Sequence, residues 1–252
     1  MKIATWNLNS LKVRLPHLLD WLAANQPDAV CLQELKCENK AFPLADIEAA
    51  GYHAVFNGQK TYNGVAILSK KPLSEVSYDI PGFADEQKRI VAGTLDGVRI
   101  VCGYFPNGQA VGSDKFAYKL DWLAALTAWL RTELQATPQL VLAGDYNIAP
   151  EDRDAHPDWK DEIHVSVPER DAFKALLALG LTDAFRLFEQ PERSFSWWDY
   201  RMGAFRRNFG LRIDHLLLSQ PLVGTCTACA VDKTPRKLER PSDHAPVVVD
   251  LA

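Results

Sequence analysis

Polar side chains that could carry chemistry lie at the ends of apolar runs in several parts of the chain. Asp145 and Asn147 follow the apolar run Gln139–Ala143, and because they are two positions apart their side chains point the same way at a strand end. Aspartate and asparagine also favour turns, which explain this segment well when it is taken alone. Turns explain poorly why further apolar runs end or begin with the same residue types: Asn7, Glu34, Asp214 and the Asp243–His244 pair.

These residue types favour the binding of a hard cation. A carboxylate beside a buried strand is costly unless an ionic partner or a metal stabilises it. Carboxylate and amide oxygens suit Mg²⁺, with Mn²⁺ as a substitute, and not zinc. The sequence has no G-x-S-x-G, H-E-x-x-H or G-x-x-x-x-G-K-[ST] motif, so the serine hydrolase, zinc protease and P-loop classes lose their main support.

The elements that must position these residues are short strands alternating with helices. Asp96-Gly97 predicts a two-residue hairpin turn, so part of the sheet structure is antiparallel. We expect two stacked sheets with outer helices in a single domain over residues 1–252. The expected strands are Lys2–Trp6, Ala29–Gln33, Tyr52–Phe56, Gly64–Leu68, Ile90–Leu95, Val98–Tyr104, Gln139–Ala143, Phe195–Trp198, Ile213–Ser219, Thr225–Val231 and Val247–Leu251. The expected helices are one around Leu15–Leu22 with Pro16 in its first turn, one over residues 114–135, and Glu169–Leu179.

Composition narrows the class of protein further. The chain has 252 residues, 47% of them hydrophobic, and 28 Lys+Arg against 32 Asp+Glu give a net charge of −4. This composition is typical of a folded globular protein and excludes nucleic-acid binding by positive charge over the whole surface, although a local basic face is compatible with it. No apolar run approaches the roughly 20 residues that span a bilayer, and the first ten residues lack a signal peptide's apolar core. We therefore expect no membrane contact and a cytoplasmic location.

The cysteines indicate a reducing environment. An odd count of 5 argues against a closed disulfide framework, and Cys31 and Cys102 lie in apolar runs as expected of core residues. Cys226 and Cys229 form a C-x-x-C in a strand-like segment. Strand alternation would point their side chains to opposite faces, which disfavours a metal or redox role.

Eight motifs together make the chain closely resemble the bacterial exonuclease III family of the endonuclease/exonuclease/phosphatase superfamily. The resemblance runs essentially end to end. GDYNIAP and SDHAPV are specific to the superfamily, and SWWDYR followed by LRID is specific to its DNA-repair branch. In chain order the motifs are WNLNS (6–10), LQELK (32–36), NGVAILSK (63–70), GYFPNG (103–108), GDYNIAP (144–150), SWWDYR (196–201), LRIDHLLLS (211–219) and PSDHAPV (241–247).

The resemblance implies an α/β fold, a four-layer α-β-β-α sandwich of two mixed sheets flanked by helices. It implies Mg²⁺-dependent cleavage of DNA phosphodiesters, with incision 5′ to abasic sites and removal of nucleotides or blocking groups from 3′ ends. In the family's pattern Glu34 matches the principal metal ligand, Asp145 the residue that activates water, and Asp214 the carboxylate that orients His244. The implied metal ligands are Asn7, Glu34, Asp145, Asn147 and Asp243, and the implied catalytic residues are Tyr104, Asp145, Asn147, Asp214 and His244.

Of the two Asp-His dipeptides, we expect only Asp243-His244 to supply a catalytic histidine. His244 would donate a hydrogen bond to the scissile phosphate, with its tautomer fixed by Asp214. Alternation along a strand should turn His215 away from the face of Asp214, so a packing role is expected for His215.

Residues 193–212 combine arginines with aromatic residues, and residues 233–240 form a second basic stretch. Any single aromatic residue here could equally belong to the core. Together, cations for phosphates and rings for an unstacked sugar or base favour a nucleic-acid partner. The resemblance places Trp197, Leu211 and Ile213 at a pocket for an abasic deoxyribose and makes Arg89 a backbone contact, while Lys115 is a candidate by its charge and position alone.

His164 departs from the family pattern. It lies in a long loop, residues 149–168, where family members usually carry a small residue before the Pro-Glu-Arg of residues 168–170. We hypothesise that its ring lies beside the scissile phosphate, disfavours a continuous strand with an abasic site and favours 3′-terminal substrates. The alternative is a histidine on a surface loop.

The sequence therefore predicts a DNA-repair nuclease that acts, as a monomer, on double-stranded DNA with abasic sites, nicks or recessed 3′ ends. The runner-up is a phosphatase or phospholipase of the same superfamily acting on an inositol phosphate or sphingolipid, which the stretch 193–212 speaks against. A DNA-binding scaffold without chemistry is disfavoured because every expected polar position is filled. An acid–base enzyme without metal would keep its activity under chelation.

Overall fold

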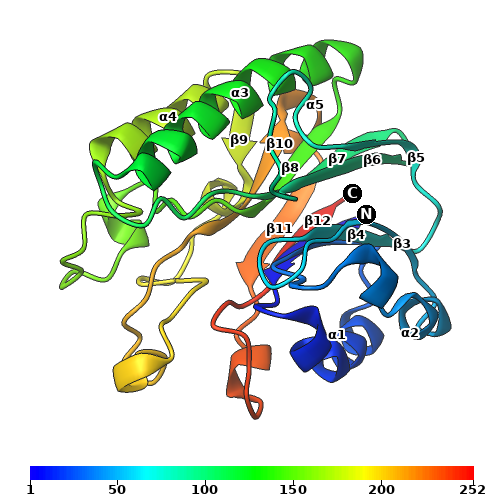
Figure 1. The fold of residues 1–252 in the computed structure, drawn as a ribbon, viewed down its shortest axis with the longest axis horizontal. Helices are drawn as coiled ribbons and strands as arrows, with labels where there is room; N and C mark the ends of the chain where they lie inside the picture. The colour runs from blue at the N-terminus through cyan, green and yellow to red at the C-terminus, as the bar shows by residue number, and fades with distance from the viewer.

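Two six-stranded β-sheets pack face to face in the computed structural model, which describes residues 1–252, and helices cover both outer faces (Figure 1). The predicted α/β sandwich of two mixed sheets is confirmed. The first sheet has the order β11-β12-β1-β2-β4-β3 and contains β1 (Lys2–Asn7), β2 (Ala29–Gln33), β3 (His53–Asn57), β4 (Val65–Ser69), β11 (Cys226–Val231) and β12 (Val247–Leu251). The second has the order β5-β6-β7-β8-β10-β9 and contains β5 (Ser74–Tyr78), β6 (Ile90–Leu95), β7 (Val98–Tyr104), β8 (Leu140–Asp145), β9 (Leu181–Asp183) and β10 (Asp214–Ser219).

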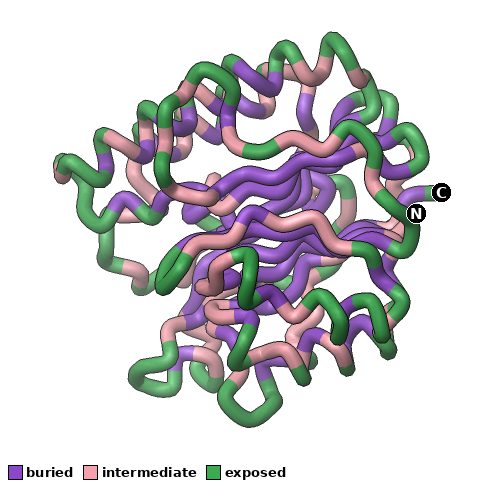
Figure 2. Tube along the Cα trace, turned by 45° about the vertical axis from the view of Figure 1, so that its right-hand side comes forward, coloured by how far each residue is buried: buried purple, intermediate pink, exposed green.

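Three apolar layers hold the sandwich together. One lies between the sheets and includes Cys31 and Cys102, both fully buried as expected. Helices α1 (Leu11–Asn25) and α2 (Leu44–Ala49) cover the first sheet, and α3 (Asp114–Ala136) and α4 (Val167–Leu177) cover the second, while the short α5 (Gln220–Val223) follows β10. Figure 2 shows the buried strands at the centre and exposed segments on the helices and loops. Since the central strands are buried on both faces, their sequences read as continuous apolar runs.

The topology brings the predicted polar residues to one rim of the sandwich. β1 and β2 run parallel, so Asn7 and Glu34 leave the first sheet at the same edge. In the second sheet Tyr104 pairs with Asp145, and antiparallel β10 places Asp214 opposite Asp145 as well. β12 runs antiparallel to β1, so the segment before β12 also returns to this rim.

Two expectations about regular elements are wrong in detail. α1 begins at Leu11, earlier than the leucine pattern indicated, so Pro16 lies inside the helix and not in its first turn. Residues 195–198 form no strand, although Trp197 makes single bridges to Leu211 and His244. The segment therefore joins two neighbouring loops at the rim by single bridges and does not extend either sheet. The expected Asp96-Gly97 hairpin is present, with both residues at positive φ.

The C-x-x-C prediction is also corrected. A β-bulge between Cys226 and Ala228 shifts the register, so that Cys226 pairs with Leu251 and Cys229 with Val249. Both cysteines therefore face the layer between the sheets, where Cys229 is buried and Cys226 packs beside it. One extra residue in a strand reverses the alternation from which opposite faces were expected.

None of the helices combines the length and the apolar composition that crossing a bilayer demands.

Candidate active site

Three ionisable side chains converge at the rim between the sheets. Glu34 directly follows β2, Asp145 ends β8, and His244 precedes β12; one ligand atom from each lies within 4.8 Å of the others. Asp145 and His244 are buried, and Glu34 is partly exposed. Two carboxylates and an imidazole from three separate strands form a centre open to solvent on one side.

Asn7 bridges the two carboxylates of this centre. Its amide nitrogen donates to Glu34 Oε1 and to Asp145 Oδ2, both at 2.9 Å, and so joins the two sheets. Its oxygen accepts the N–H of Asn9, so in this structure the nitrogen of Asn7 and not the predicted ligand oxygen faces the carboxylates. The Tyr104 hydroxyl donates to Glu34 Oε1 at 3.0 Å. Burial, followed by the charges of Glu34 and Asp145, raises the pKa of Tyr104 well above its usual value, so the phenol stays a donor.

The donor set suits a divalent cation. Carboxylate oxygens from Glu34 and Asp145 are hard ligands. The ammonium of Lys36 lies 2.8 Å from Glu34 Oε2, which shows that a positive charge is already accommodated at this edge. Burial raises the pKa of Asp145 to about 7, with the charge of Asp214 adding to it and that of His244 opposing it. A carboxylate whose charge is this costly gains from a bound cation.

His244 is oriented by a buried carboxylate. Its Nδ1 lies 2.9 Å from Asp214 Oδ2, and its Nε2 points toward Asp145, 3.7 Å from Oδ2. Burial disfavours the charged ring, but the charges of Asp214 and Asp145 outweigh burial and raise the pKa of His244 to about 10. The ring is therefore an imidazolium at neutral pH, and its Nε2–H is a donor aimed into the centre.

Ser196, which the sequence analysis does not single out, holds the Asp214 carboxylate. Its hydroxyl donates to Asp214 Oδ2 at 2.6 Å and accepts the backbone N–H groups of Ile213 and Asp214, each at 3.1 Å. It thus fixes the carboxylate that fixes His244. The signal was its place at the start of the SWWDYR motif, but a serine in a loop has many other uses.

Asn147 and His164 lie side by side at the second-sheet end of the centre. Asn147 has a left-handed backbone (φ 51°), and its amide nitrogen donates to the carbonyl of Phe105 at 3.0 Å. His164 Nδ1 lies 2.7 Å from the Asn147 carbonyl, and His164 Nε2 lies 3.5 Å from the amide nitrogen of Asn107. Burial and the nearby charge of Lys119 lower the pKa of His164 to about 3, so its ring is neutral with the proton on Nδ1. His164 is buried beside the centre and is not a surface loop residue.

Asp243 stands apart from the Glu34–Asp145–His244 group. Asn9 donates to its Oδ1 and the Trp197 indole to its Oδ2, both at 2.9 Å. Trp197 in turn packs against the buried Leu211 and Ile213. Asp243 thus links the polar centre to Trp197, Leu211 and Ile213, which the family resemblance places at a deoxyribose pocket.

A groove of about 620 Å³ lies next to Tyr104 and is lined by the β3–β4 loop, the residues that follow β7 and the start of α3. Its lining includes Tyr104 and Asn107 from the centre and the predicted DNA contacts Arg89 and Lys115. The Arg89 guanidinium lies over the Tyr104 ring, 4.9 Å from its centroid, and donates to the Tyr104 carbonyl at 3.0 Å. Cations and rings along one groove form a surface suited to a phosphate backbone.

His215 lies on the other face of β10, as alternation indicated. Its ring packs edge-on against Tyr146 and Phe173, and its Nε2 lies 2.8 Å from the Ile148 carbonyl. Its Nδ1 is 3.0 Å from Arg212, a buried arginine whose guanidinium also donates to Asp154 and Asp183. The predicted packing role of His215 is confirmed.

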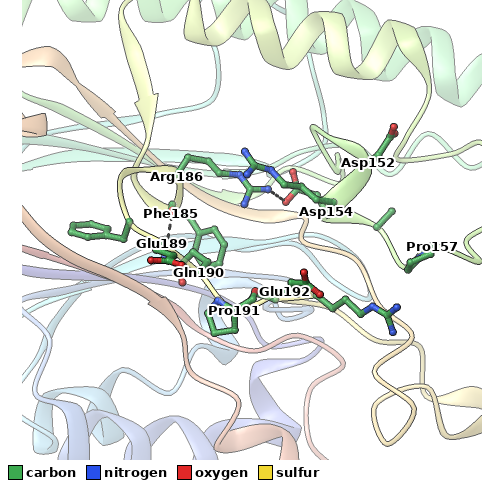
Figure 3. A pocket seen from close by; sticks show the side chains of 14 residues that line it. Asp152, Asp154, Pro157, Phe185, Arg186, Glu189, Gln190, Pro191 and Glu192 are labelled. Atoms are coloured by element: carbon green, nitrogen blue, oxygen red, sulfur yellow. Dashed lines mark hydrogen bonds and ion pairs between the residues drawn. The ribbon is translucent and has the colours of Figure 1, made fainter.

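A second cavity of about 570 Å³ lies beside Asp154 and holds none of the predicted site residues. Figure 3 shows Arg186 beside this cavity with an ion pair to Asp154, and the side chains of Asp152, Glu189 and Glu192 around it. This cavity therefore lies apart from the candidate active site.

Comparisons with known proteins agree with this geometry. Residues 4–244 match the family model described as the Endonuclease/Exonuclease/phosphatase family. Exodeoxyribonuclease III from Haemophilus influenzae is 36% identical over 98% of this chain and 98% of its own length. Among solved structures, the 3′ phosphatase NExo from Neisseria, bound to product DNA hairpin, superposes with a TM-score of 0.98 at 47% identity, covering 100% of this chain and 99% of its own. An AP endonuclease from Archaeoglobus fulgidus superposes with a TM-score of 0.96 at 38% identity, covering 100% and 99%. The chain therefore belongs to the endonuclease/exonuclease/phosphatase family.

Proposed function

We propose that this chain, a DNA-repair nuclease of the exonuclease III type, acts chiefly on the 3′ ends of duplex DNA. It removes terminal nucleotides or blocking groups there and incises abasic sites less well. The observation that carries this proposal is the ring of His164, buried against Asn147 beside the Glu34–Asp145–His244 group. Residues 1–252 would act as one catalytic domain and as a monomer.

The chemistry is assigned to residues around Glu34. We propose Glu34, Asp145 and the neighbouring Asn7 and Asn147 as the residues that hold Mg²⁺, or Mn²⁺ in its place, with Asp243 in the outer coordination. The bound cation would offset the negative charge of the phosphodiester and stabilise the charge of the pentavalent transition state. Glu34, Asp145 and Asn7 are proposed because their side chains converge at one rim. Asn147 and Asp243 are proposed because they lie two residues after Asp145 and one residue before His244 at the same rim.

Proton transfer is assigned to Asp145 and His244. Asp145, with a pKa raised to about 7 by burial, is suited to accept a proton from the attacking water. His244, held by Asp214, would donate from Nε2 to a non-bridging phosphate oxygen. Asn147 and the Tyr104 hydroxyl would add neutral hydrogen bonds to the same phosphate.

DNA would lie along the groove that contains Arg89 and Lys115, with the sugar at the cleavage point against Trp197, Leu211 and Ile213. A strand with an internal abasic site continues on both sides of the scissile bond, so part of it must pass His164. At a 3′ terminus the strand continues on one side only. The His164 ring therefore obstructs the first kind of substrate more than the second. The 47% identity to a 3′ phosphatase supports this preference, against 38% to an AP endonuclease.

Labelled duplexes test the proposal directly. They carry an abasic analogue, a nick with a 3′-phosphate or a recessed 3′ end, and each is assayed with Mg²⁺, Mn²⁺ or EDTA. We expect cleavage of the 3′-terminal substrates with either cation, weak abasic incision, and no activity in EDTA. No cleavage of any duplex would overturn the proposal. Hydrolysis of inositol phosphates or sphingolipids in its place would support the phosphatase alternative, and activity in EDTA would support chemistry without metal.

Replacing His164 tests the preference itself. Glycine or serine at this position should raise the ratio of abasic incision to 3′-phosphate removal by about tenfold or more. The backbone at His164 is left-handed (φ 73°), which glycine adopts freely, so H164G is expected to fold. His156 lies in the same loop as His164, and its ring packs at a tilt against Phe209, 4.5 Å between centroids, so H156A is the matched control. An unchanged ratio in H164G would reject the preference while leaving the nuclease activity in place.

A further inference from the structure

A fully buried ion pair lies directly behind the proposed active site. Lys119 of α3 and Glu169 of α4 are both 0% exposed, and Lys119 Nζ lies 2.5 Å from Glu169 Oε1. Two charges removed from water lose their hydration, and an ion pair in the interior is retained only when further hydrogen bonds satisfy it. The identity of those further partners indicates what the pair does.

The ammonium of Lys119 is bound to the backbone of the active-site loops. It donates to the carbonyl of Asn147 at 2.7 Å and to the carbonyl of Asn107 at 3.2 Å. The Asn147 carbonyl also accepts the hydrogen bond from His164 Nδ1 at 2.7 Å. One oxygen atom thus holds both the buried lysine and the histidine ring.

The carboxylate of Glu169 is bound to the loop that carries His164. Its Oε1 accepts the backbone N–H of His164 at 3.1 Å, and its Oε2 accepts the N–H and hydroxyl of Ser166 at 3.2 and 2.5 Å. The Ser166 contacts form a capping box, which a glutamate makes equally well at a solvent-exposed helix end. The contacts with Lys119 and His164 go beyond capping.

The backbone of His164 needs this support. A φ of 73° is uncommon for a residue with a side chain and persists only where the surroundings enforce it. The Glu169 carboxylate holds its N–H from one side, and the Asn147 carbonyl holds its ring from the other.

We infer that Lys119 and Glu169 are a specificity-determining positioning pair, which holds the His164 ring against Asn147 and so sets the preference between 3′-terminal and abasic substrates. Neither side chain reaches the substrate. The inference rests on the proposed role of His164 and deepens it. The competing account is that the pair only fastens α3 to α4.

Hydrogen exchange and the substrate ratio separate the two accounts. K119M leaves Glu169 charged and unpaired, so the K119M/E169Q double variant, which removes both charges and keeps a capping amide, guards against a failure to fold. E133Q is the matched control. Glu133 also lies on α3 and pairs with the buried Arg99, but it is in the last turn of the helix, whereas Lys119 is near its start. All variants are made in the full chain, with and without H164G.

We expect K119M/E169Q to raise the ratio of abasic incision to 3′-phosphate removal by about tenfold and to speed amide exchange at His164 by a similar factor. In the H164G background the same double change should leave the ratio unaltered, because the ring that it positions is gone. E133Q should leave both readouts as in the wild type. A folded K119M/E169Q protein with wild-type ratio and wild-type exchange at His164 would overturn the inference, as would an equal shift of the ratio in the H164G background.

Failure of the proposed function has a different signature. If H164G alone leaves the ratio unchanged, His164 does not select substrates. The exchange rate at His164 in K119M/E169Q then still decides whether the pair positions this residue.

Discussion

His244 and Asp214 form a buried pair in which Nδ1 of the imidazole lies 2.9 Å from Oδ2 of the carboxylate. The pair leaves Nε2 as the ring atom that faces the centre. Asp214 therefore controls both the orientation and the charge of His244, although it would not touch the substrate.

Replacing Asp214 with asparagine should lower kcat/KM for 3′-phosphate removal by about a hundredfold, because the ring loses its orienting partner. D96N is the control: Asp96 lies in a hairpin turn that asparagine suits equally well. A D214N protein with near wild-type activity would show that His244 needs no partner.

The same variant should change the charge of His244. Its folded pKa, about 10, lies above the unfolded value of roughly 6.5, so the native state holds the proton more tightly. The resulting stabilisation is complete below pH 6.5 and is lost as the pH rises toward 10. In D214N the ring should titrate at clearly lower pH, as followed by NMR of the ring in EDTA. An unchanged titration would assign the raised pKa to Asp145 alone.

Divalent cations should stabilise the wild-type protein against unfolding. A cation that binds only the native state raises the unfolding free energy by about 2.7 kcal/mol when its concentration is a hundred times Kd. E34Q should lose this response, because Glu34 is the proposed principal ligand, and Asp96→Asn should keep it. The measurement is thermal unfolding with increasing Mg²⁺ or Mn²⁺. An equal rise of Tm in E34Q would place the cation elsewhere.

The sequence predicts the rim because strand ends are readable. Asn7, Glu34 and Asp145 each lie at the end of an apolar run, and the ends that carry Asn7 and Glu34 meet because β1 and β2 run parallel. The same reasoning fails at Cys226, since a bulge in the strand cannot be seen in the alternation that it interrupts. It also fails at residues 195–198, where apolar residues fill a loop cluster and not a sheet.

The pairing of Lys119 with Glu169 lies beyond such patterns. The two residues are 50 positions apart on two helices, and a buried lysine leaves no mark in the sequence that an exposed one would not. Ser196 and Asn107 were within quoted motifs, but their roles depend on which backbone groups they meet in space. Residue types at strand ends carry information about chemistry, whereas the contacts that position those residues require the packed structure.

The buried cluster around Arg212 should be a major source of stability. Arg212 donates to Asp154 and Asp183 at 2.6 and 2.7 Å, and all three side chains are at most 7% exposed. Removing one member leaves buried charges unpaired, so R212M should lower the unfolding free energy by about 3–5 kcal/mol. The exposed pair of Arg153 with Glu151 is the comparison, and R153A should cost at most about 1 kcal/mol. Urea unfolding decides, and a loss in R212M no greater than that in R153A would contradict the prediction.

Buried neutral histidines should make the metal-free protein less stable in mild acid. Burial holds the pKa of His164 at about 3, well below the unfolded value of roughly 6.5. Between these pH values His164 is protonated in the unfolded chain but not in the native state. Its contribution to the unfolding free energy is therefore complete above pH 6.5 and falls as the pH drops toward 3. Asp145, whose folded pKa is raised to about 7, works in the opposite sense from pH 7 down to about 4 and partly masks the effect in the wild type.

The contribution of His164 is therefore isolated by a difference between two proteins. Asparagine does not titrate and tolerates the left-handed backbone, so H164N should remove about 1.4 kcal/mol of pH dependence per pH unit between pH 6 and 4.5. Unfolding free energies from urea titrations in EDTA at several pH values give the two slopes, and every group common to both proteins cancels in their difference. Equal slopes of unfolding free energy against pH in the two proteins would contradict the prediction. They would mean that the native state holds His164 as an imidazolium, and not as the neutral ring that the contact with the Asn147 carbonyl allows.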